Sequence, residues 1–161
     1  MSRTSASSFR AMKGLIQRVS EARVVVDGNT VGEIDRGILL LLGVQKGDDG
    51  ACLEKLLDKV LAYRIFPDAA GHMNLSLTDI AGQLLIISQF TLSADTKKGL
   101  RPSFSSAAPP EIAETIYDEF VSHARGRCAE GKCSKIQTGI FGADMKVSLL
   151  NDGPVTFLLE T

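Results

Sequence analysis

The chain has 161 residues, of which 44% are hydrophobic and 23% are charged, and its formal net charge is −1. This composition is typical of globular proteins, excludes the disordered classes, and gives no global electrostatic reason to expect a nucleic-acid partner, which would need a local patch. The length predicts one domain, over residues 12–161. The Ser-rich residues 1–11 are predicted to be a disordered leader, and an organelle-targeting role for them stays open.

The three cysteines indicate the compartment. Cys52, Cys128 and Cys133 have neither the even number of a disulfide framework nor the spacing of a zinc site, so we expect thiols, no metal and a cytoplasmic protein. The longest apolar run, residues 38–44, is too short to cross a membrane. We therefore expect no membrane association.

The first third of the chain predicts a hairpin, a buried strand and a helix. Residues 15–26 are rich in β-branched side chains and end at a turn signal, after which residues 30–34 resume the extended pattern. Residues 38–44 lack polar alternation and should be covered on both faces of a sheet. Asp48 or Asp49 can cap the following helix, whose apolar stripe is formed by Leu53, Leu56, Leu57, Val60 and Leu61.

The remaining two thirds predict a second strand, a second helix and two final strands. Residues 83–92 read as a buried strand, and residues 93–108 as a long ordered loop. Pro109 and Pro110 open an amphipathic helix that Gly126 is expected to end. Two strands then flank Gly153-Pro154. This order predicts an α+β fold with a curved, mainly antiparallel or mixed, barrel-like β-sheet packed by the two helices.

Motifs for several kinds of chemistry are missing from the sequence. Neither His72 nor His123 lies in a catalytic motif, and the chain has no Gly-x-Ser-x-Gly elbow, P-loop, Rossmann fingerprint or His-Glu-x-x-His. Triad catalysis is unsupported and no cofactor is expected. Three features remain: polar residues that end the strand at 88–92, a basic loop after it, and the Gly-Pro pair. Taken singly, they are also explained by a strand end, a solvated loop and a tight turn.

Together these features resemble a known family. "SQFTL" (88–92) and "NDGPVT" (151–156) are similar to the two signature motifs of the D-aminoacyl-tRNA deacylase (D-tyrosyl-tRNA(Tyr) deacylase) family. Five further segments stand in the family's order: "LIQRV" (15–19), "AYRIFPD" (62–68), "MNLSL" (73–77), "GLRPSF" (99–104) and "QTGIFGADMKVSL" (137–149). The resemblance covers residues 12–161 and leaves out residues 1–11.

The resemblance implies both a reaction and an assembly. The family hydrolyses the ester that joins a D-amino acid to the 3′-terminal adenosine of tRNA, and releases the amino acid and free tRNA. It implies a homodimer in which a cis Gly153–Pro154 peptide of one subunit enters the partner's pocket and rejects L-aminoacyl groups. Glycyl-tRNA, which has no side chain to reject, should then be hydrolysed as well. The 2′-hydroxyl of the terminal ribose is expected to activate the attacking water.

The resemblance also implies roles for individual residues. The backbone N–H groups of Phe90 and Thr91 are expected to stabilise the oxyanion. Ser88 and Gln89 should contact the terminal nucleotide or shape its pocket, and Arg18 should brace the Gly-Pro segment. A nucleophilic role for the Thr91 hydroxyl stays open.

Two further groups of residues complete the expected site. Phe141 and Met145 should line the pocket wall, although a core position explains Met145 equally well. The residues expected to hold tRNA phosphates are cationic, namely Lys97, Lys98 and Arg101, with Arg125, Arg127, Lys132 and Lys135 as second candidates. The alternatives to this function are a nucleic-acid-binding dimer without turnover and a general Ser/Thr esterase.

Overall fold

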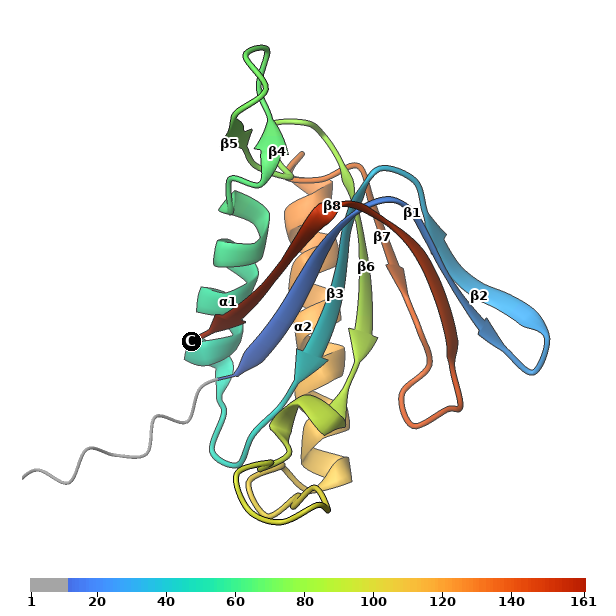
Figure 1. Ribbon diagram of the computed structural model, residues 1–161, viewed down its shortest axis with the longest axis vertical. Coiled ribbons are helices and arrows are strands. Elements are labelled where there is room, and N and C mark those ends of the chain that lie inside the picture. The colour runs from blue at the N-terminus through green and yellow to red at the C-terminus, as the bar shows by residue number, and fades with distance from the viewer. Residues whose placement is uncertain (1–11) are drawn as a thin grey trace, which may run out of the picture.

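The computed structural model describes residues 12–161, so the predicted leader at residues 1–11 lies outside the described part. Its centre is a six-stranded mixed sheet in the order β2-β1-β3-β6-β7, with β8 paired to β1, and two helices lie beside it (Figure 1). The strands are β1 (Lys13–Val26), β2 (Asn29–Ile34), β3 (Gly37–Gly43), β6 (Gln83–Ser88), β7 (Lys135–Thr138) and β8 (Lys146–Glu160). The helices are α1 (Gly50–Ala62) and α2 (Pro110–Ala129).

Three short elements connect these parts. β4 (Phe66–Pro67) and β5 (Met73–Leu75) form a two-stranded sheet of their own. The turn η1 (Phe90–Ser93) is a 3₁₀-helix that follows β6. The predicted α+β fold with a mixed sheet and two helices is confirmed.

Two strands are buried on both faces, as their unbroken apolar runs predicted. In β3, Ile38 and Leu40 belong to the large core between sheet and helices, while Leu39 belongs to a second cluster on the opposite face. In β6, Leu84 and Leu85 divide in the same way. Successive strand residues point to opposite faces, so each run fills two cores.

The second core exists because the sheet curls toward closure. The backbone N–H of Glu33 on β2 donates to the Gln137 side-chain oxygen on β7 at 3.3 Å. A Cβ on Gly32 would lie 2.4 Å from the carbonyl oxygen of Thr138, so only glycine permits this approach. The two edges of the sheet therefore lie against each other, which gives the predicted barrel-like shape.

The first helix begins where its sequence predicted. Asp49 is the N-cap, and its carboxylate accepts the backbone N–H of Cys52 at 3.0 Å. The five residues of its apolar stripe are all buried.

The second helix is one turn longer than predicted, and the expectation that Gly126 ends it is wrong. A Cβ on Gly126 would meet nothing within 4 Å, so this glycine lies on an open helix face. The helix ends instead in a Schellman motif at Gly131, whose φ is 88°. There Lys132 N–H donates to the Arg127 carbonyl at 3.0 Å and Gly131 N–H donates to the Cys128 carbonyl at 3.0 Å.

Two strand predictions also need correction. The strand expected over residues 83–92 stops at Ser88, because the chain turns into η1 immediately afterwards. The two strands expected around Gly153-Pro154 are one long strand, β8, that pairs with β1 on both sides of the motif. The short strand β7, at the end of the basic connector, was not predicted.

Candidate functional site

The polar residues at the end of β6 are placed by the η1 turn. Gln89 N–H donates to the Leu42 carbonyl at 2.8 Å, which is the last bond between β6 and β3. Leu92 N–H then donates to the Gln89 carbonyl at 3.2 Å and closes the turn. The N–H groups of Phe90 and Thr91 come before this first bond of the turn, where helical N–H groups lack intrahelical acceptors. The Gln89 side-chain amide donates to the Thr91 hydroxyl.

Phe141 lies near the end of β6 because Tyr117 of α2 connects the two. The Tyr117 hydroxyl donates to the Ile86 carbonyl at 2.8 Å, and its ring centroid lies 5.9 Å from that of Phe141. Burial, with a smaller contribution from Asp118, raises the pKa of Tyr117 to about 12, so the hydroxyl remains a donor at neutral pH. Sequence reasoning missed this role, because Tyr117 looked like an ordinary member of the helix stripe.

Met145 is part of the second core. Its side chain packs against the cluster that includes Val24, Leu85 and Ile87. A Cβ on Gly139 would lie 2.5 Å from the Met145 sulfur, so the glycine makes room for it. Met145 is only half-buried, which leaves part of the side chain accessible near the end of β6.

The loop from residue 93 to residue 108 is held by hydrogen bonds, and its cations face solvent. Asp95 and Ser103 exchange two backbone hydrogen bonds, of 2.7 and 3.0 Å. The Ser106 hydroxyl donates to the Ser93 carbonyl at 2.6 Å, which ties the loop to η1. The three cations of this loop are exposed, namely Lys97, Lys98 and Arg101.

The exposed ring of Phe90 connects this basic loop to η1. Phe90 is 62% exposed, and its centroid lies 5.2 Å from that of Phe104, which is 41% exposed. The four expected residues 88–91, the basic loop and Phe141 are thus brought to one end of the sheet. Two of the second-candidate cations lie elsewhere: Arg127 forms an ion pair with Asp58 of α1, and Lys135 pairs with Gln83 at the other end of β6.

The Gly-Pro segment forms a bulge in β8. Val19 pairs with Asn151 and Gln17 pairs with Thr156, so four residues of β8 stand opposite the single residue Arg18. The Gly153–Pro154 peptide bond is cis. Asp152, Gly153 and Pro154 are all exposed, so the bulge projects from the sheet.

Arg18 holds this bulge. Its Nε donates to the Asp152 carbonyl at 2.7 Å and its Nη1 donates to the Ile65 carbonyl at 2.6 Å. The Arg18 side chain is 12% exposed, and the Asp152 carboxylate lies 3.6 Å from Nε. A guanidinium offers several donors in a fixed plane, so it can fix two separate carbonyls at once.

The bulge and the η1 turn lie at opposite ends of the sheet. Arg18 pairs with Ile38, which pairs with Leu84, whereas Ser88 pairs with Leu42. Four residues of β6 therefore separate the two levels, which is about 13 Å along the strand. In Figure 1, β8 bends at the upper end of the main sheet, below β4 and β5, and the turn after β6 lies at the lower end of the sheet.

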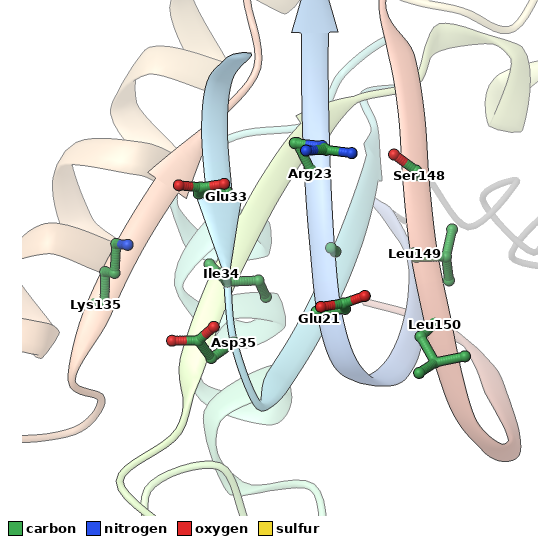
Figure 2. Close-up of a pocket in the computed structure, with 10 residues that line it drawn as sticks. Glu21, Arg23, Glu33, Ile34, Asp35, Lys135, Ser148, Leu149 and Leu150 are labelled. Carbon is green, nitrogen blue, oxygen red and sulfur yellow. The ribbon is translucent and has the colours of Figure 1, made fainter.

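A pocket of about 390 Å³ is lined by residues of neither the β8 bulge nor the η1 turn. Figure 2 shows that its side chains come from β1, β2, β7, β8 and the turn after β2, including Glu21, Glu33 and Lys135. Lys135 pairs with Gln83 at the opposite end of β6 from Ser88. None of the residues predicted to bind the amino acid or the terminal nucleotide lines this pocket.

The fold and the site together define a class of protein: an α+β domain that exposes a backbone turn, an aromatic ring and a basic loop at one end of a curled sheet. Comparison with known proteins then gives the family. The family model described as D-Tyr-tRNA(Tyr) deacylase matches residues 15–160. The chain belongs to this family of hydrolases, which act on an ester bond.

Individual relatives agree with this assignment. A D-aminoacyl-tRNA deacylase of Cellvibrio japonicus is 62% identical over 92% of this chain and 99% of its own length. Another, of Teredinibacter turnerae, is 59% identical over 93% of this chain and 100% of its own. The resemblance inferred from the seven segments is therefore confirmed.

Two solved structures are similar in fold. One, titled c-Myc DNA Unwinding Element Binding Protein, has a TM-score of 0.86 and 40% identity, and the match covers 92% of this chain and 98% of that one. The other, titled as a probable eukaryotic D-amino acid tRNA deacylase, has a TM-score of 0.81 and 17% identity over 94% and 100%. Within residues 12–161, no helix is both long enough and apolar enough to span a membrane.

Proposed function

We propose that this chain hydrolyses the ester bond of D-aminoacyl-tRNA, and that a Gly153–Pro154 segment excludes L-aminoacyl groups. The observation that carries the proposal is the family match over residues 15–160, because it includes both motif segments that the structure exposes. The finer parts of the mechanism rest on the geometry of these two segments.

In the proposed reaction the protein positions the ester, and a hydroxyl of the tRNA, rather than a side chain, activates the attacking water. Within the described residues both histidines lie on other elements: His123 faces Glu54 on the helix layer at 3.6 Å, and His72 follows β4. We therefore assign the activation of water to the 2′-hydroxyl of the terminal ribose. Water adds to the ester carbonyl and passes one proton, by way of the 2′-hydroxyl, to the ribose 3′-oxygen as the bond to that oxygen breaks. The amino acid leaves as a carboxylate, and the second proton of the water goes to solvent.

The oxyanion of this reaction needs donors, and the η1 turn offers them. The N–H groups of Phe90 and Thr91 come before the first bond of the turn, so they are available to a carbonyl oxygen placed beside it. Removing one such donor typically costs about 2.7–4 kcal/mol of transition-state stabilisation. Ser88 and Gln89 would shape the adjoining space for the terminal nucleotide, with Phe141 and part of Met145 as its wall.

Rejection of L-aminoacyl groups requires a second copy of the chain. About 13 Å along β6 separates the bulge of one chain from its own η1 turn, so the bulge reaches such a site only from a partner protomer. We therefore propose a homodimer in which each active site combines the η1 turn of one protomer with the bulge of its partner. Exposed apolar side chains on β8 are compatible with a protein partner, among them Leu149 and Leu150.

The basic loop is the proposed contact for the tRNA backbone. Lys97, Lys98 and Arg101 are exposed and follow the η1 turn directly, so phosphates near the terminal adenosine would lie within their reach. The three cysteines are thiols, which agrees with the proposed cytoplasmic location.

Incubation with D-Tyr-tRNA and L-Tyr-tRNA tests the function. Release of free tyrosine from the D-ester, with much slower release from the L-ester, is the expected result. Glycyl-tRNA should also be hydrolysed, because glycine has no side chain to reject. Release from both tyrosyl esters at equal rates would contradict the steric account.

A second candidate is nucleic-acid binding without turnover. The neighbour titled c-Myc DNA Unwinding Element Binding Protein, 40% identical to this chain, favours it. The same incubation distinguishes the deacylase from a binding protein, because a binding protein would leave the ester bond of the aminoacyl-tRNA intact. A tRNA that ends in 2′-deoxyadenosine separates the deacylase from a general Ser/Thr esterase, which would not need the 2′-hydroxyl.

A further inference from the structure

The two ends of the bulge in β8 are joined by the side chain of Asn151, the first residue of the "NDGPVT" segment, to which the proposed mechanism assigns no role. The Asn151 amide nitrogen donates to the Arg18 carbonyl at 3.0 Å and to the Val155 carbonyl at 3.0 Å. Its oxygen accepts the Val155 N–H at 3.3 Å. A single half-buried side chain thus joins the two ends of the bulge to each other and to β1.

These bonds replace the sheet ladder where it is interrupted. Because four residues of β8 stand opposite Arg18, the regular exchange of backbone bonds between β1 and β8 cannot continue there. The Asn151 amide presents two N–H donors and one carbonyl acceptor, which is the set that the Arg18 carbonyl and the Val155 backbone require. An aspartate of the same shape would offer no donors.

Asn151 and Arg18 hold different parts of the bulge. The Arg18 side chain, on β1, holds the carbonyl of Asp152 within the bulge. Asn151 fixes the separation of residues 151 and 155, and Val155 is only 4% exposed and anchored in the core. The exposed residues between them, Gly153 and Pro154, therefore project from a base with both ends fixed.

We propose that Asn151 is a positioning residue for stereochemical selection: it sets how far Gly153 and Pro154 project, and thereby where an L side chain is stopped. This inference rests on the proposed function. The three hydrogen bonds of the Asn151 amide all go to backbone atoms of Arg18 and Val155, so its loss should act on the ratio of the rates for D- and L-Tyr-tRNA rather than on the chemical step alone.

The experiment measures that ratio for Asn151→Ala. The variant loses three part-buried hydrogen bonds that fix both ends of the bulge. A displacement of the bulge by a fraction of an ångström should then lower the D-to-L rate ratio on Tyr-tRNA by at least about tenfold. Asn29→Ala is the matched control, because Asn29 is an exposed asparagine whose amide makes a single 3.4 Å bond in the β1–β2 turn. The control should keep the ratio.

A structural role alone predicts a different result. If Asn151 only adds stability, Tm falls while the D, L and glycyl rates keep their wild-type proportions in the folded fraction, and the inference is overturned. Asn151→Asp, which retains the acceptor for Val155 N–H and loses both donors, is measured beside it and should also lower the ratio. If both variants fail to fold, Asn151 is a folding residue and the inference is likewise overturned.

Failure of the proposed function gives a separate result. A wild-type chain that hydrolyses neither hand of Tyr-tRNA contradicts the deacylase proposal and with it the role in selection. An active, selective wild-type chain whose Asn151 variants keep their selectivity contradicts the positioning role alone.

Discussion

Replacing Gly153 by alanine is expected to slow hydrolysis of D-Tyr-tRNA strongly in a chain that still folds. A Cβ at this position would lie 2.0 Å from the Val155 nitrogen and 3.1 Å from the Val155 Cα, and real Cβ contacts essentially never fall below 3.0 Å. The backbone must therefore move by about 1 Å. Val155 is buried, so the exposed bulge is the part that shifts.

The size of the effect follows from that displacement. A misplacement of about 1 Å in an active site costs on the order of 100-fold in rate, so the rate on D-Tyr-tRNA should fall by about this factor. Overpacking of this kind costs about 1–3 kcal/mol of stability, which corresponds to a decrease in Tm of roughly 2–12 °C. Single-turnover release of tyrosine and a thermal melt measure the two quantities.

Gly126→Ala is the control, because it makes the same chemical change where a Cβ meets nothing within 4 Å. This substitution inside α2 should raise stability by about 0.5–1 kcal/mol and leave hydrolysis unchanged. Wild-type rates and wild-type selectivity in Gly153→Ala, with the control behaving as expected, would show that the position of the bulge does not govern the reaction.

Three further predictions concern separate parts of the chain. Thr91→Ala should keep substantial activity if the RNA supplies the base, and near-complete loss in a folded variant would instead favour a nucleophilic hydroxyl. Binding of tRNA should weaken steeply with salt, and neutral replacements at Lys97, Lys98 and Arg101 should flatten that slope by about one unit for each phosphate that is no longer neutralised; an unchanged slope would exclude the loop from the tRNA interface. Asp48→Asn should raise the Tm at pH 7. Burial, partly offset by the Gln45 N–H bond, raises the pKa of Asp48, and its Oδ1 has no hydrogen-bond partner among the described residues. A raised folded-state pKa favours folding below the unfolded value of about 3.8, and that contribution is lost as pH rises through the folded-state pKa, so the gain should vanish near pH 3. An equal gain at both pH values would refute this cause.

Local patterns predicted the regular elements well because the residues that define them are close in sequence. The stripe from Leu53 to Leu61 is found as predicted, and of the two cap candidates, Asp48 and Asp49, the structure has Asp49. The unbroken run in β3 required two covered faces, and two clusters cover them.

The errors arose where distant contacts outweigh local signals. Gly126 looked like a helix end, but an exposed helical glycine costs only about 1 kcal/mol, and the next turn of α2 continues past it. The strand was predicted to continue to residue 92, but after Gln89 N–H makes its last bond to the Leu42 carbonyl of β3 the chain turns into η1. Asn151 was missed for the same reason, because its partner Arg18 is 133 residues away.

The distance between the bulge of β8 and the η1 turn has a consequence for mixtures of damaged chains. In a dimer whose sites each combine η1 of one protomer with the bulge of the other, a chain altered only at η1 and a chain altered only at Gly153 complement each other. Their heterodimer has one site with both lesions and one site with neither. Two preparations that are each strongly impaired alone should therefore recover activity after their subunits exchange.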